Sequence, residues 1–156
     1  MNVFADIEQS GLATWVRESP SLWGYPMFLT LHTVGLGLLV GTSTAINLRI
    51  LGFGRQTNLD SMGRFFPFLW LGFWISLVSG AVLWIADAAV WSKDVVFYIK
   101  MGVIVLALIN VRLIRSLVFR NPDSAPSTGA KALAIGSLFL WVAAITAGRL
   151  TAYIGK

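Results

Sequence analysis

The chain has 156 residues, of which 56% are hydrophobic and 12% are charged, and it contains no cysteine. This composition is too apolar for a soluble domain of that length, and without cysteine there are no disulfides, thiolate metal sites or covalently attached c-type haem. The formal net charge is +5. The basic residues flank apolar segments and form no separate aromatic and basic surface, so we expect no nucleic-acid partner.

Residues 1 to 20 predict a short amphipathic helix that lies on the membrane surface. Its apolar residues recur at near-helical spacing, and Pro20 ends the segment: Phe4, Ile7, Leu12, Trp15 and Val16. The segment lacks a basic region followed by an uninterrupted apolar stretch. We therefore expect no cleaved signal peptide, and we expect the first spanning helix to direct insertion.

Four apolar segments follow, each about as long as the 20 residues that a helix needs to cross a bilayer. They cover residues 22 to 48, 65 to 88, 95 to 117 and 132 to 154. The sequence thus predicts an all-α integral membrane protein, a four-helix bundle over residues 21 to 156 in contact with lipid.

The chain also resembles two related halves. Asn47-Leu48-Arg49 closes the first span and Asn110-Val111-Arg112 closes the third, while residues 74 to 80 roughly repeat residues 141 to 148. Two explanations are open at this point. The halves are duplicated helical hairpins, or Asn and Arg simply end both helices for electrostatic reasons.

The basic residues are unevenly distributed between the two sides of the predicted bundle. Most of them lie after the first and third spans: Arg49, Arg55, Arg64, Arg112, Arg115, Arg120 and Lys131. The other side has mainly Arg17, Lys93 and Lys156, mixed with Asp6, Glu8, Glu18 and Asp94. Because positive charge near span ends marks the cytoplasmic side, we predict a multi-pass protein of the bacterial inner membrane with both termini outside.

Helical spacing predicts which faces of the first two spans contact protein. One stripe of the first span should face protein, and it holds His32, Gly35, Leu36, Leu39, Ser43 and Asn47. Gly37 and Gly41 add a pair of small residues that lets another helix approach. In the second span, Gly72, Ser76, Ser79 and Asp87 form a small face, opposite a tryptophan stripe of Trp70, Trp74, Leu77, Ala81, Trp84 and Trp91. That stripe suits lipid, a second subunit or a flat aromatic cofactor.

The polar groups of the spans lie at similar depths. His32, the only histidine, lies roughly 14 Å from the outer ends of the spans, and Lys100 and Arg149 lie about 8 Å in. A neutral imidazole with cations above it suits an axial haem ligand whose propionates meet Lys100 and Arg149, or a hydrogen bond to a quinone. In the alternative interpretation the two cations extend to the interface, Asp87 pairs with one of them, and His32 bonds only a neighbouring helix.

Several motifs carry a resemblance to a known family: Leu31-His32-x-x-Gly35, Asn47-Leu48-Arg49-x-Leu51-Gly52, Phe97-x-x-Lys100, and Trp141 followed by Gly148-Arg149-Leu150 and Tyr153. From Trp23 onward the chain resembles an uncharacterised bacterial family of four-helix membrane proteins. More weakly, through Lys100 and the helix layout, it is similar to copper-resistance D proteins and membrane b-type cytochromes. Those cytochromes commonly use paired histidines, so the resemblance implies a second axial ligand from Met27, Met101, water or another chain.

The sequence therefore predicts a small membrane subunit or anchor of a redox system, holding a b-type haem or a quinone through His32. No metalloprotease, P-loop or nucleophile-elbow motif supports a self-contained hydrolase. The competing prediction is a non-enzymatic membrane component for transport or assembly, for example of copper. With one histidine per chain, we expect a homo-oligomer or a larger membrane complex.

Overall fold

The computed structural model describes residues 3–54, 56–120 and 125–154, with side chains up to residue 150. Four long helices make up most of this part: α3 (Tyr25–Leu51), α5 (Phe66–Ala86), α7 (Val95–Val118) and α8 (Thr128–Ile154). The short helices are α1 (Val3–Glu8), α2 (Gly11–Glu18), α4 (Leu59–Gly63) and α6 (Ala88–Trp91). Within the described residues, four helices are long and apolar enough to cross a membrane, which confirms the predicted all-α four-span protein.

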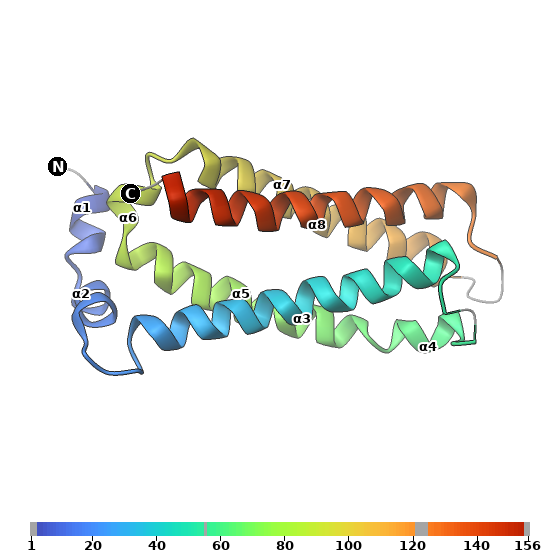
Figure 1. Cartoon of the computed structure of the whole chain (residues 1–156), viewed down its shortest axis with the longest axis horizontal. Coiled ribbons are helices and arrows are strands. Elements are labelled where there is room, and N and C mark those ends of the chain that lie inside the picture. The colour runs from blue at the N-terminus through green and yellow to red at the C-terminus, as the bar shows by residue number, and fades with distance from the viewer. Residues whose placement is uncertain (1–2, 55, 121–124, 155–156) are drawn as a thin grey trace.

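The long helices associate as two antiparallel hairpins. α3 packs along α5, α7 packs along α8, and α3 also contacts α8, which joins the two hairpins into one bundle (Figure 1). One end of the bundle, here called the cap end, carries α1, α2 and α6. The opposite end, called the loop end, carries α4, the C-terminal end of α7 and the start of α8. The hairpin arrangement confirms the predicted layout, while its origin by duplication stays a prediction.

Capping residues set the helix boundaries, which differ by a few residues from those that hydropathy alone predicts. The predicted single N-terminal helix is two helices, because the Ser10 side chain accepts a hydrogen bond from the Ala13 amide and starts α2 afresh. α3 has Pro26 in its first turn and ends at Gly52, whose φ of 104° suits the left-handed cap of a helix. The helix of the second predicted span ends at Ala86, and the short helix α6 begins after Asp87.

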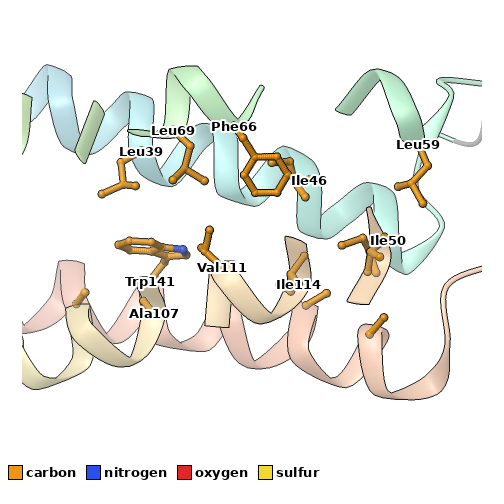
Figure 2. Close-up of a cluster of buried hydrophobic side chains, with 14 residues drawn as sticks. Leu39, Ile46, Ile50, Leu59, Phe66, Leu69, Ala107, Val111, Ile114 and Trp141 are labelled. Carbon is orange, nitrogen blue, oxygen red and sulfur yellow. The ribbon is translucent and has the colours of Figure 1, made fainter. Parts of the chain in front are cut away.

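The apolar core lies between the two hairpins and is richest toward the loop end. Figure 2 shows Leu39 and Ile46 of α3 and Leu69 of α5 facing Val111 of α7 and Trp141 of α8. Trp141 is only 2% exposed and is the largest fully buried side chain. Many other apolar residues of the spans are exposed, as lipid-facing positions must be, since the core of a bilayer is itself apolar.

The closest helix contact is the crossing of α3 and α5. A Cβ added at Gly35 would lie 2.7 Å from the Ser76 amide nitrogen, and one added at Gly72 would lie 2.6 Å from that of Leu39. The two backbones therefore touch where neither residue has a side chain, which confirms the small face predicted for the second span. A Cβ added at Gly37 or Gly41, in contrast, would meet no atom of another element within 4 Å, so this pair packs no helix of the described chain.

The predicted tryptophan stripe is not one continuous surface. Trp74 and Leu77 are 57% and 47% exposed and face the membrane. Trp84 packs edge-on against Phe4 of α1, with 6.2 Å between the ring centres. Trp70 lies under the guanidinium of Arg112, 5.6 Å from its ring centre. The stripe therefore divides into a lipid-facing middle and two ends that contact other parts of the chain.

Candidate functional site

His32 lies on α3 in the cap half of the bundle, with its ring against α5. Its Nδ1 is 2.8 Å from the Ser76 carbonyl oxygen, 3.3 Å from the Ser76 hydroxyl and 3.5 Å from the Ser79 hydroxyl. A carbonyl oxygen only accepts hydrogen bonds, so Nδ1 carries the hydrogen and donates a hydrogen bond to the Ser76 carbonyl. The neutral ring therefore has its lone pair on Nε2.

Gly80 makes room for this ring. A Cβ at that position would lie 2.8 Å from Cε1 and 3.0 Å from Nδ1 of His32, so any larger residue would displace the imidazole. Ser79 is held independently, because its hydroxyl donates to the Ile75 carbonyl. The ring thus lies in a fixed orientation on a surface made by small residues of α5.

The fixed tautomer decides which ligands His32 suits. A histidine that binds a metal commonly donates its other ring N–H to a backbone carbonyl, which orients the ring and raises its basicity. The Ser76 carbonyl provides that partner. Nε2 of the neutral ring can coordinate iron or accept the hydroxyl hydrogen of a quinol, but it has no hydrogen to donate to a quinone carbonyl.

Lys100 lies on α7 and is half-buried against α8. A Cβ added at Gly148 would be 3.5 Å from both Cε and Nζ of Lys100, so the small residue at position 148 leaves space for the lysine side chain. His32 and Lys100 thus lie on different hairpins, and each side chain packs against a glycine of the neighbouring helix.

Arg149 follows Gly148 on α8 and its side chain is exposed. It therefore lies beside the Lys100 contact but on the outer surface of the helix. Two surface grooves of about 320 and 350 Å³ are lined by other residues, at the start of α3 and at the end of α7. A pocket shared by His32, Lys100 and Arg149 consequently stays a prediction.

A redox metal at His32 would need most of its ligands from elsewhere. Within the described residues, no group of three or more His, Cys, Asp or Glu side chains could hold a metal ion. Met27 lies five positions before His32 on α3 and is half-buried, whereas Met101 is 38% exposed. A haem at His32, with Met27 or Met101 as its second ligand, stays a prediction.

Asp87 has other charged neighbours than Lys100 and Arg149, one of which it pairs with in the alternative interpretation of the sequence. Its charged neighbours are Arg17 of α2 and Glu8 of α1. Partial burial, which is the larger effect, and the Glu8 carboxylate raise the Asp87 pKa, while Arg17 opposes that rise. Arg17 donates to the Ala86 carbonyl at 3.0 Å, and Glu8 accepts from the Ala89 amide at 3.0 Å. The N-terminal helices are thereby fastened to both sides of the break between α5 and α6.

A buried polar network in the middle of the bundle was not predicted as a unit. The Asn47 amide donates to the Ser137 hydroxyl at 2.9 Å and to the Ser43 hydroxyl at 3.4 Å, and the Trp141 indole N–H donates to Ser43 at 2.8 Å. The i, i+4 spacing of Ser43 and Asn47 on the protein-facing stripe was the only signal in the sequence. The network joins α3 to α8, so it links the two hairpins.

No protein-family model, curated protein or solved structure matches this chain. The resemblance to a family of four-helix membrane proteins stays a prediction from the sequence. What the chain shows is a four-span helical membrane protein.

Proposed function

We propose that this protein is a small membrane subunit of a redox system and presents His32 to a b-type haem or a quinol in the cap half of the bundle. One observation carries the proposal. The Ser76 carbonyl fixes the proton on Nδ1 of His32, at 2.8 Å, and so directs the lone pair to Nε2.

Lys100 supports the proposal because it is a cation from the opposite hairpin. Its side chain lies beside Gly148 of α8. A haem carries two propionates and a quinol gains negative charge when it loses a proton, so a nearby ammonium stabilises either ligand. Arg149, one residue further along α8, would meet a propionate at the membrane surface.

The chain's own residues would position the cofactor and would hold a proton at one atom. A bound haem would supply one-electron transfer. His32 would hold the ligand through Nε2, and with a quinol Nε2 would accept the hydroxyl proton. The Ser76 carbonyl would stabilise the resulting imidazolium through the Nδ1–H bond. A quinol is thus favoured over a quinone, because the neutral ring accepts at Nε2 and does not donate.

The orientation belongs to the same proposal. With the arginine-rich loop end in the cytoplasm, the cap end lies outside, and His32 faces the outer half of the bilayer of a bacterial inner membrane. A proton accepted from a quinol would then leave on the outer side.

The experiment is an absorption spectrum and a quinone extraction of the protein purified in mild detergent. We expect either a Soret band or a bound quinone, with loss of that ligand in His32→Ala and its retention in Thr33→Ala, a matched change at an exposed neighbour. Gly80→Ala provides a second variant, because it displaces the ring while the histidine remains. A colourless, quinone-free wild-type protein would reject the proposal.

A second function is favoured by the packing of His32. Its ring fills the space that Gly80 leaves and bonds the α5 backbone, which equally suits a non-enzymatic component for transport or assembly. In that case His32→Ala lowers the thermal stability of the protein. The amounts of copurifying partner subunit and of any bound cofactor stay unchanged. Measuring both quantities on the same variant separates the two functions.

A further inference from the structure

The C-terminal end of α7 forms a basic groove at the loop end of the bundle. The groove has a volume of about 350 Å³ and is lined by Arg112, Arg115, Ser116, Phe119 and Arg120. We propose that this groove binds the phosphate of an anionic phospholipid. The proposal is independent of the cofactor at His32, which lies in the opposite half of the bundle.

Aromatic side chains hold two of the arginines in place. The guanidinium of Arg112 lies 5.6 Å from the Trp70 ring centre, and that of Arg115 lies 5.3 Å from the Phe66 ring centre. A guanidinium within about 6 Å of an aromatic ring is attracted to it, which favours side-chain conformations that keep the cation at the groove. The N–H donors of the two arginines are therefore held near one another, and a phosphate accepts such donors in pairs.

The Phe119 ring at the floor of the groove is held by contacts with neighbouring helices. The Phe119 ring packs edge-on against Phe66, with 5.0 Å between the centres, and a Cβ at Gly63 would lie 3.4 Å from it. The Ser116 hydroxyl donates to the Leu113 carbonyl, so its hydrogen is already engaged and the arginines are the main donors to a ligand. Contacts from α4 and α5 thus shape a site whose charged residues come from α7.

The positive charge of the groove is not balanced within the described chain. The ion pairs among the described residues all involve Arg17, at the other end of the molecule. The dipole of α7 favours cations at its C-terminus, but it amounts to roughly half an elementary charge. Three guanidiniums within one groove exceed that amount, so a bound anion lowers their mutual repulsion.

The surroundings of the groove favour a lipid over a soluble anion. Leu113 and Leu117, on the same helix, are 45% and 60% exposed, so apolar surface adjoins the arginines. Arg112 lies six residues before the end of α7, about 9 Å along the helix axis, which is within reach of the headgroup region. A phospholipid places its phosphate on the arginines and its acyl chains on the leucines. An inorganic phosphate would use only the first of these contacts.

The test measures retention of phosphatidylglycerol and of phosphatidylcholine by native mass spectrometry of the purified full-length protein. We expect the Arg112→Gln/Arg115→Gln variant to bind phosphatidylglycerol about tenfold more weakly, equivalent to about 1.4 kcal/mol. The matched control, Arg64→Gln/Lys131→Gln, removes two exposed charges from the same end outside the groove and should change binding by less than about twofold. The Arg112→Lys/Arg115→Lys variant keeps the charge but loses the paired N–H donors. Its affinity for phosphatidylglycerol should lie between those of the glutamine variant and the control.

Each other outcome argues against the lipid site. Equal losses in the groove and control variants would show diffuse attraction of anionic lipid to the whole loop end. Competition by inorganic phosphate at the same concentration as the lipid would identify a free-anion site. Equal retention of phosphatidylcholine would show that the phosphate charge is not recognised. A thermal unfolding curve for each variant confirms that the bundle is intact.

Discussion

Two asparagines in the bundle are buried to similar extents but are satisfied very differently. Asn47 is 1% exposed and donates to Ser137 and Ser43, whereas Asn110 is 9% exposed and its Oδ1 is buried without a hydrogen-bond partner in the described part of the chain. A buried polar atom is costly when unpaired and only modestly stabilising when paired. Both residues begin an Asn-x-Arg motif toward the end of a span, but Asn47 should stabilise the bundle and Asn110 should not.

The first prediction contrasts substitutions at these two positions. Asn47→Leu should destabilise the bundle by about 1–2 kcal/mol, because it removes the buried hydrogen bond to the Ser137 hydroxyl and the longer one to Ser43. Asn110→Leu should be neutral or stabilising, since it replaces a side chain that has an unpaired acceptor with an apolar side chain of similar volume. Both values come from reversible denaturation in mixed micelles. A larger loss at Asn110 than at Asn47 would contradict the hydrogen-bond assignment.

At the scale of elements, the α3 and α5 hairpin depends on two glycines that have no space for a side chain. The atoms that a Cβ would meet at Gly35 and Gly72 include backbone nitrogens of the facing helix, which cannot rotate away. Gly37 and Gly41 lie on the same α3 helix with open space around them. The four glycines thus divide into a packing pair and an outward-facing pair.

The second prediction follows from that division. Gly72→Ala should push the two helices apart and cost about 1–3 kcal/mol, the usual range for overpacking. Gly41→Ala should leave the unfolding free energy of the isolated chain within about 0.5 kcal/mol of wild type. If Gly41→Ala alone alters the oligomeric state in cross-linking, the outward-facing pair serves a partner, as the expected homo-oligomer or larger complex requires.

Periodicity and hydropathy were sufficient to predict the four spans and the buried stripe of α3, because lipid exposure and helix geometry leave strong patterns. They could not predict that Gly35 packs a helix and Gly37 does not, because that depends on the crossing point with α5. The depths of His32 and Lys100, counted along the helices, stay predictions. The exposure of Arg149 and the location of Asp87 near Glu8 and Arg17 were not predictable, because rotation about a helix and the docking of α1 and α2 are tertiary features.

At the scale of the whole molecule, the structure has a polar, hydrogen-bonded cap at one end and an arginine-rich surface at the other. The third prediction concerns the direction in which this molecule lies in the membrane. Reporters fused after Asn58 should be cytoplasmic and fusions at Lys93 external, since positive charge is retained on the cytoplasmic side. The reverse pattern of alkaline phosphatase and fluorescent-protein signals would place His32 in the inner half of the bilayer instead.

The fourth prediction concerns the pH dependence of the cap. The Asp87 pKa is raised above its ordinary value of 3.8, so the folded cap binds a proton more readily than the unfolded chain. Stability from this group is therefore highest at low pH and declines as pH rises from the ordinary pKa through the raised one. Asp87→Asn should remove that decline.

Limited proteolysis between α2 and α3, at a series of pH values from the ordinary Asp87 pKa of 3.8 upward, provides the measurement. The informative quantity is the difference between wild type and Asp87→Asn at each pH. A difference that is independent of pH would show that Asp87 does not titrate differently in the cap.

The attachment of the N-terminal helices has a consequence for the order of synthesis. Arg17 bonds a carbonyl 69 positions later in the chain, and Glu8 bonds an amide 81 positions later. During synthesis, the first two helices leave the ribosome before their anchoring points exist. They therefore stay unanchored, and accessible to proteases, until the chain beyond α5 has been made. A truncation that ends before Ala86 should therefore yield a chain whose first twenty residues are degraded first, although the α3 segment is already in the bilayer.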